Sequence, residues 1–205
     1  MSRVPPGVVR LQDQQRALTR RAILQAARAL FSTQGYAATS VRALAAEAGV
    51  SVQTIYDTFG SKAGVLGGMP DLIDEEAEVH EIVAALQASR DARESLGLFV
   101  RLRRRIRERC GDIMATLRSG ASVDPQVAAA LAEGMRRRRF GLERMMEGLA
   151  AGGALKPELT APRAADMASA LVCDEVCDVL VEQQGWSFDE YESWLTDALV
   201  TLLLK

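Results

Sequence analysis

The stretch from Thr39 to Lys62, TSVRALAAEAGVSVQTIYDTFGSK, predicts two short helices joined by a tight turn. Thr39 or Ser40 is suited to cap a helix whose apolar residues recur at helical spacing, namely Val41, Leu44, Ala45 and Ala48. Gly49 supplies the positive φ that ends this helix, and Ser51 caps the next one. Helices this short need a further packing surface, so the rest of the chain must supply one.

The second of these helices combines an apolar stripe with a polar face. The stripe consists of Val52, Ile55, Tyr56 and Phe59, and the polar face carries Gln53, Thr54, Asp57 and Thr58. A helix-turn-helix presents side chains to base edges from this part of its second helix. A polar face also occurs wherever a helix simply meets solvent, so the interpretation depends on the remaining sequence.

Charge is divided unevenly along the chain. Residues 1–66 hold eight Lys/Arg and three Asp/Glu, a formal charge of +5, whereas the remainder holds 17 and 24, a formal charge of -7. The net charge of -2 therefore hides a basic N-terminal segment on an acidic body. Attraction to phosphate at one end of the protein is the interpretation we favour over chance asymmetry.

The packing surface is predicted just before the two short helices. From about Gln14 to Gln34, apolar residues follow the helical repeat: Ile23, Ala26, Ala27, Leu30 and Phe31. Gly35 ends this helix, which completes a three-helix unit. Residues 1–12, with two prolines and two arginines, lack periodicity and are expected to form a flexible basic arm that contacts DNA backbone.

After Gly60, Ser61 is expected to cap another helix, which opens with Lys62. A lysine in the first turn is unfavourable in the field of the helix dipole, so a group outside the helix should compensate for it. A phosphate is one such group, because the same helix end offers free N–H groups. The glycines and the proline that follow predict a short or bent helix.

Beyond Pro70 the sequence predicts only helices, over about 72–89, 92–118, 125–151, 163–184 and 188–204, and no strand. The expected fold class is all-α, with 13–66 as a DNA-binding domain and 67–205 as a ligand-binding and dimerisation domain. The last two helices are apolar on more than one face. We expect them to pair with their symmetry mates in a homodimer. The alternative is that both are core helices of a monomer.

Other classes of function find little support. The single histidine and the absence of paired CxxC units exclude most catalytic and zinc constellations, so no catalytic residue, metal or cofactor is predicted. Cys110, Cys173 and Cys177 are interpreted as small buried residues, with a thiol sensor or soft-metal site as the alternative. No apolar run reaches the ~20 residues of a membrane span, and a cytoplasmic protein is expected.

The segment from about Arg20 to Leu66 resembles the TetR family of bacterial transcriptional regulators. The resemblance rests on the elements GYAATSV, AEAGVS and YDTFGSK. It implies nine helices, three of them in the DNA-binding module and the last two at a dimer interface. It also implies that Ser40 and Arg42 approach phosphates, that Val52, Gln53, Thr54, Asp57 and Thr58 face bases or backbone, and that Tyr56 and Lys62 bind phosphates.

Candidate ligand-binding residues are fewer and come from the C-terminal helices. Phe99, Met114 and Met145 suit an adaptable apolar pocket, although methionine in a helix is commonly core. Arg138 interrupts an apolar stripe formed by Leu131, Met135, Leu142, Met145 and Leu149. It either meets an acidic group or extends to solvent. The arginine runs 101–109 and 136–139 are interpreted as solvated faces paired with nearby acids.

These observations favour a ligand-responsive transcriptional regulator, a dimeric repressor that binds a palindromic operator and is released by a small-molecule effector. Two alternatives remain, a helical enzyme of unknown chemistry and a DNA-binding protein with no effector.

Overall fold

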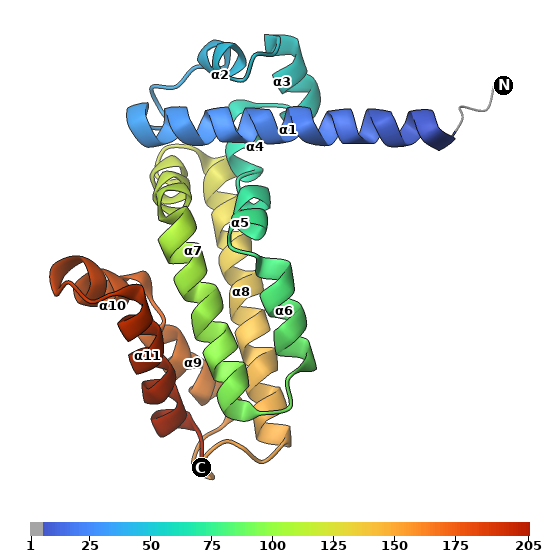
Figure 1. Cartoon of the computed structure of the whole chain (residues 1–205). Helices are drawn as coiled ribbons and strands as arrows, with labels where there is room; N and C mark the ends of the chain where they lie inside the picture. The colour runs from blue at the N-terminus through green and yellow to red at the C-terminus, as the bar shows by residue number, and fades with distance from the viewer. Residues whose placement is uncertain (1–5) are drawn as a thin grey trace. The chain divides into compact units, whose positions relative to one another are not determined.

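The computed structural model describes residues 6–205, with side chains from residue 11 onward, as a set of helices (Figure 1). Within that range no strand occurs, and the only β-type pairing is an isolated bridge between Leu155 and Leu204. The chain forms two compact units. The first contains the residues up to Leu72 together with Asp112–Leu131, and the second contains Ile73–Gly111 and Ala132–Lys205.

The first unit is built on helix α1 (Pro6–Gln34), against which α2 (Val41–Glu47) and α4 (Lys62–Gly67) pack, and α3 (Val52–Phe59) packs against α2 and α4. The buried residues of its core include Ile23, Leu24, Phe31, Leu44, Ile55 and Leu66. A cap is present at each of the three predicted starts, and of Thr39 and Ser40 it is Ser40 that caps α2. Ser40, Ser51 and Ser61 each accept a bond from the backbone N–H three residues later. Each short helix therefore begins where its serine predicts.

Helix α1 begins at Pro6, earlier than the expected start near Gln14, so the part of the predicted arm that the structure describes is helical. Residues 1–5 of that arm lie outside the described residues. Proline is well suited to a first helical position, and the leucine, glutamines and arginines that follow are good helix formers. Local propensity therefore extends the helix beyond its apolar repeat.

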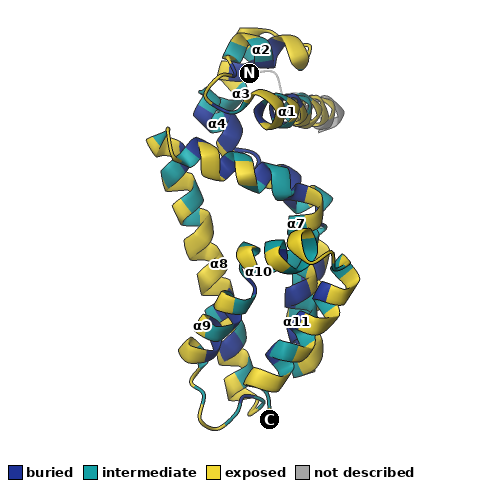
Figure 2. Ribbon diagram, turned by 90° about the vertical axis from the view of Figure 1, so that its left-hand side faces the viewer, coloured by how far each residue is buried: buried dark blue, intermediate teal, exposed yellow. Residues whose placement is uncertain are grey.

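The second unit contains α6 (Val79–Ala88), most of α7 (Ala92–Ala121) and α8 (Pro125–Ala151), and the C-terminal elements. Its core joins α7, α8, α9 (Ala161–Leu171) and α11 (Phe188–Leu203), with Leu96, Met146, Leu195 and Leu199 fully buried. Residues 134–141 of α8 are exposed (Figure 2). The predicted apolar stripe of α8 is therefore buried only in part, since Met135 remains 55% exposed.

Two predicted helices are interrupted. The helix expected over 72–89 is divided into α5 (Pro70–Glu76) and α6, because Glu78 adopts the left-handed conformation with φ 53°. The helix expected over 163–184 is divided into α9, α10 (Asp174–Cys177) and a π-helical segment, η1 (Asp178–Gln183). Helix α7 is kinked at Cys110, which departs from helical geometry with φ -132° and ψ 19°. These breaks explain why the described residues form more helical pieces than nine.

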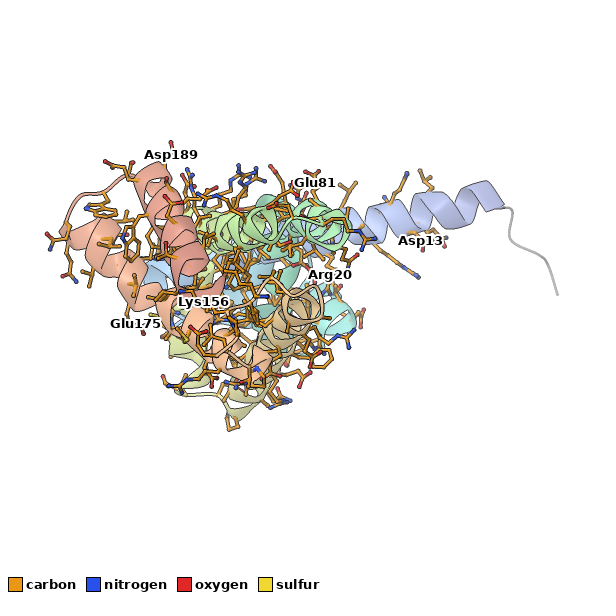
Figure 3. All side chains as sticks on the ribbon, turned by 90° about the horizontal axis from the view of Figure 1, so that it is seen from below. Asp13, Arg20, Glu81, Lys156, Glu175 and Asp189 are labelled. Atoms are coloured by element: carbon orange, nitrogen blue, oxygen red, sulfur yellow. The ribbon has the colours of Figure 1, made fainter. Side chains whose placement is uncertain are left out.

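Arginines of α7 form ion pairs with acids of other helices in the second unit. Arg104 contacts Asp189 at 2.5 Å and Glu192 at 2.9 Å, and Arg107 contacts Asp178 at 2.5 Å. Arg105 and Arg109 both bind Glu78, the residue that breaks the α5–α6 helix. Figure 3 shows charged side chains, Asp189 among them, on the outer surface of these helices. The run 101–109 is accordingly an interhelical network.

Candidate nucleic-acid interface

The turn between α2 and α3 has the geometry that a helix-turn-helix requires. The Ser40 hydroxyl accepts a bond from the N–H of Ala43 at 3.1 Å, and the Ser51 hydroxyl accepts one from the N–H of Thr54 at 3.0 Å. Between them, Gly49 has φ +66°. Two caps and one left-handed glycine thus set the angle between the helices.

Helix α3 packs through one side chain and exposes most of the others. Ile55 is fully buried, while Val52 is 37% and Tyr56 46% exposed. The sequence placed these two in the apolar stripe with Ile55 and Phe59, and that assignment is wrong. An eight-residue helix that packs on α2 and α4 buries only a narrow strip, which leaves Val52 and Tyr56 exposed.

The predicted DNA-contacting residues of α3 fall into two groups. Gln53 and Asp57 are exposed and bonded to each other, with the Gln53 amide 2.7 Å from the Asp57 carboxylate. Thr54 and Thr58 are half-buried, and the Thr58 hydroxyl donates to the Thr54 carbonyl at 2.7 Å. On α2, Ser40 and Arg42 are exposed, and Arg42 has no ion-pair partner among the residues described.

Lys62 is held by the protein itself. Its ammonium donates to the carbonyl oxygens of Tyr36 at 2.8 Å and Thr39 at 3.0 Å, and lies 4.3 Å from the Tyr36 ring centroid. These carbonyls and the ring compensate the charge that the α4 helix dipole disfavours. A phosphate contact by Lys62 stays a prediction, and in this structure its donors are used within the first unit.

Two polar contacts join α1 and the α1–α2 loop to the segment 112–131 of the same unit. Arg28 binds Asp112 with two bonds of 2.6 and 2.8 Å. The Tyr36 hydroxyl donates to Asp124 at 2.7 Å, and Asp124 also accepts from the N–H of Gln126 at the start of α8. Burial works against the charged form of Asp112, but the bond from Arg28 outweighs it and lowers the pKa of this carboxyl.

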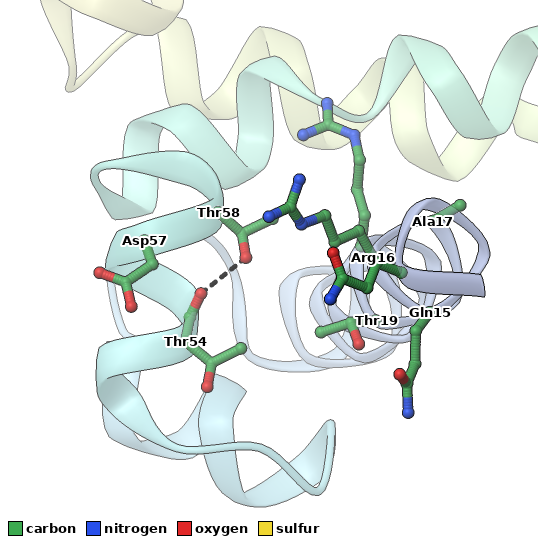
Figure 4. A pocket seen from close by; sticks show the side chains of 9 residues that line it. Gln15, Arg16, Ala17, Thr19, Thr54, Asp57 and Thr58 are labelled. Atoms are coloured by element: carbon green, nitrogen blue, oxygen red, sulfur yellow. Dashed lines mark hydrogen bonds between the residues drawn. The ribbon is translucent and has the colours of Figure 1, made fainter. Parts of the chain in front are cut away.

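A groove lies between α1 and α3 (Figure 4). We call it the α1–α3 groove. It has a volume of about 840 Å³ and is lined by Gln12, Gln15, Arg16, Ala17, Thr19 and Arg20 of α1 and by Thr54, Asp57 and Thr58 of α3. Sequence reasoning did not single out these α1 residues. The sequence pattern that could have identified them is the helical spacing of polar residues at positions 12, 15/16 and 19, which places them on the same side of α1 as Ile23.

The candidate ligand-binding residues are not gathered in one place. Phe99 is buried in the core of the second unit, and Met145 packs against that core. Arg138 is exposed on α8, and Met114 belongs to the first unit. Their role in ligand binding stays a prediction.

The cysteines and the acidic residues do not form a further candidate site among the described residues. The three cysteines are free thiols, with Cys110 and Cys177 buried and Cys173 half-buried. Within the part of the chain that the structure describes, no cluster of three His, Cys, Asp or Glu side chains is placed to hold a metal ion. In the same range, no helix has the length and hydropathy needed to cross a bilayer.

The fold and the α2–α3 geometry define a helical protein with an N-terminal helix-turn-helix. A family described as "Bacterial regulatory proteins, tetR family" matches residues 23–69. No curated protein sequence matches the chain. The matched segment contains the helix-turn-helix formed by α2 and α3.

Solved structures with the same fold cover nearly the whole chain. A Saccharomonospora viridis protein described as a transcriptional regulator, in complex with choline, is 23% identical; the match covers 91% of this chain and 97% of that one, with a TM-score of 0.70. The regulator FadR from Bacillus subtilis, in complex with stearoyl-CoA, is 18% identical over 88% and 97%, with a TM-score of 0.72. A SmeT–triclosan complex is 20% identical over 91% and 92%, with a TM-score of 0.74. At these identities the likeness shows the fold alone.

Proposed function

We propose that this protein is a homodimeric transcriptional repressor that binds a palindromic operator through α2 and α3 and releases it when a small molecule binds the second unit. The observation that carries the DNA-binding part is the exposed face of α3. Gln53, Tyr56 and Asp57 are exposed, whereas Ile55 of the same helix is fully buried. The exposed Arg42 on α2 adds a positive charge beside it.

Side-chain chemistry indicates which residues of this face suit base edges and which suit phosphates. The Gln53 amide suits the edge of an adenine, and the Asp57 carboxylate suits a cytosine amine, whereas Arg42, Ser40 and Tyr56 suit phosphate oxygens. One short helix contacts only a few base pairs, so useful affinity requires two copies on half-sites roughly 34 Å apart. The proposal therefore requires a dimer.

The dimer surface we propose is made of the residues 163–184 and 188–204, which form α9, α10, η1 and α11. Several large apolar side chains remain exposed there, with Val179 at 44%, Trp194 at 38% and Leu202 at 40%. A stable interface buries about 1,000 Å² or more, which a pair of such helices from each copy can supply. Sedimentation velocity of the wild type and of Leu202→Glu tests this surface, and an unchanged dimer in the variant would contradict it.

An effector site in the second unit is supported by analogy with proteins of the same fold. Those structures contain choline, stearoyl-CoA or triclosan, three molecules with little chemistry in common. We propose that the second unit of this chain likewise takes a small molecule, and that Met145, which packs against the core of that unit, contributes to its site. A ligand changes DNA affinity only when it binds the two states of the protein unequally.

The decisive experiment measures binding of the purified protein to its own promoter region. Fluorescence anisotropy over a range of salt concentrations should give a sequence-selective complex, which Gln53→Ala weakens more for operator than for unrelated DNA. Arg90→Ala, an exposed arginine of the second unit, is the matched control for surface charge. If operator and unrelated DNA bind equally, a specific regulator is excluded.

A further inference from the structure

We propose that the α1–α3 groove holds one sugar–phosphate strand of DNA, next to the base pairs that α3 faces. This inference rests on the proposed DNA-binding function and adds a second contact surface to it. The residues concerned are Gln12, Gln15, Arg16 and Thr19 of α1, none of which lies within the family match at 23–69. The α1 wall of the groove thus lies outside the matched segment, and its α3 wall lies within it.

The groove-facing side of α1 is the same side that packs in the core further along the helix. Towards the C-terminus this side carries the fully buried Ile23 and Ala27. One and two turns earlier it carries Thr19 and Arg16, so the stripe changes from apolar to polar in the same register. Every residue from 11 to 18 is exposed.

The pattern on the outer sides of this helical segment is the reverse of the usual one. Leu11 is 65% and Leu18 66% exposed, and neither lines the groove. The segment thus turns its amides, hydroxyl and guanidinium towards α3. If this side of α1 packed against protein, its leucines would face α3 and its polar side chains would face solvent. A polar ligand in the groove accounts for the observed orientation, in which the polar side chains face α3.

The positive charge available in the groove comes from Arg16. Arg16 has no ion-pair partner among the residues described, while its neighbour Arg20 binds Asp71 at 2.7 Å and lies 4.5 Å from the Phe59 ring centroid. Arg20 therefore makes contacts within the protein, whereas the guanidinium N–H groups of Arg16 remain available to a ligand. A guanidinium flanked by amide and hydroxyl donors is the set that recognises phosphate oxygens.

The one acid that lines the groove does not oppose this. Figure 4 shows the Asp57 carboxylate turned away from α1, and the Gln53 amide donates to it at 2.7 Å. The two walls therefore differ: α1 carries cationic and donor groups, and the carboxylate of Asp57 on the α3 wall points away from them. A strand that lies against α1 avoids Asp57, while α3 remains free to meet base edges.

The groove also has a suitable length and position. From Gln12 to Thr19 the helix rises roughly 10 Å, enough for a short stretch of one strand. Thr54 and Thr58 belong both to the groove and to the exposed helix that is proposed to face bases. The second surface is thus continuous with the first, so one duplex can occupy both.

The test compares Arg16→Ala, Arg16→Lys and the control Arg90→Ala by anisotropy on an operator duplex and on an unrelated duplex of equal length. Arg16→Ala should weaken both complexes roughly tenfold for a dimer and lower the slope of log K against log salt by about two. Arg16→Lys should restore most of the slope, and Arg90→Ala should leave both unchanged. Circular dichroism verifies that each variant is folded.

A second measurement assigns the contact to particular phosphates. Methylphosphonate substitutions, which remove single backbone charges, are placed at positions flanking the operator half-site. When the phosphate that Arg16 contacts is made neutral, the wild type and Arg16→Ala should bind that DNA with equal affinity, because the contact between Arg16 and the phosphate charge is already lost. Additive losses at every position tested would overturn the inference.

The outcomes separate the two proposals. If the wild type discriminates its operator but Arg16→Ala behaves as Arg90→Ala does, the groove does not contact DNA and only this inference fails. A protein partner for the groove then becomes the better assignment. If the wild type binds no DNA selectively, the proposed function fails and the inference fails with it.

Discussion

Replacing Gly49 by alanine tests whether the turn between α2 and α3 depends on a left-handed residue. Gly49 has φ +66°, and a Cβ added there meets no atom within 4 Å. The cost of the substitution is therefore conformational, with no steric clash. A left-handed conformation costs an L-residue about 1–2 kcal/mol, and alanine regains about 0.4–1 kcal/mol by restricting the unfolded chain. We expect a net loss of about 1 kcal/mol.

The same chemical change should have the opposite sign in a helix interior. Gly141 lies within α8, also with open space around an added Cβ, and has no positive φ. Gly141→Ala should stabilise the protein by about 0.5–1 kcal/mol. The two variants, which differ only in backbone conformation at the mutated site, should thus be separated by roughly 1.5–2 kcal/mol.

Hydrogen exchange provides the assay, because it measures local opening where a two-unit protein need not unfold in one step. Amides of α2 and α3 in Gly49→Ala should exchange roughly fivefold faster than in the wild type, while those of α11 keep their rates. Operator affinity should fall together with this protection. Unchanged or slower exchange in α3 would refute the argument that the turn needs a left-handed residue.

Three further perturbations follow from the caps, ion pairs and thiols. Ser51→Ala should destabilise α3 by about 1 kcal/mol, measured by thermal unfolding, because the Thr54 N–H then loses its acceptor. The pKa of Asp112 is lowered in the folded state, so its contribution to stability is present above its unfolded pKa and is lost as pH falls through the folded value. Arg28→Ala should therefore reduce the loss of stability at acid pH in an unfolding titration. An unchanged loss would argue against this pair. Burial raises the pKa of the Cys177 thiol, so iodoacetamide should label the half-buried Cys173 first at neutral pH, and mass spectrometry would detect the reverse order if this is wrong.

The boundary between the two units lies within α7, next to its kink, and within α8. The part of α7 that belongs to the first unit begins at Asp112, two residues after Cys110, the residue that departs from helical geometry. The part of α8 that belongs to the first unit ends at Leu131. Asp112 and Asp124, which bind Arg28 and Tyr36, belong to this inserted segment. In the proposed regulator, a ligand that favours a different geometry at Cys110 would therefore act on a segment bonded to α1 and to the α1–α2 loop.

Local interactions determined most of what the sequence predicted correctly. A serine cap acts on an N–H three residues away and a glycine acts on its own φ, so Ser40, Ser51, Ser61 and Gly49 were found without knowledge of the fold. Amphipathic repeats located the long helices for the same reason, and the predicted bounds 125–151 of α8 coincide with the structure. The family match at 23–69 also falls on the segment with the most regular local signals.

Tertiary structure decided what depends on residues distant in sequence. The helix predicted over 72–89 breaks at Glu78, whose carboxylate is bound by Arg105 and Arg109, and no local signal marks such a site. Lys62 found its compensating charges on carbonyls 23 and 26 residues earlier. The α1–α3 groove exists because α3 packs beside a helix whose apolar stripe ends before the helix does. Sequence periodicity thus predicts which side of a helix is buried, while the extent of burial depends on which elements pack against it.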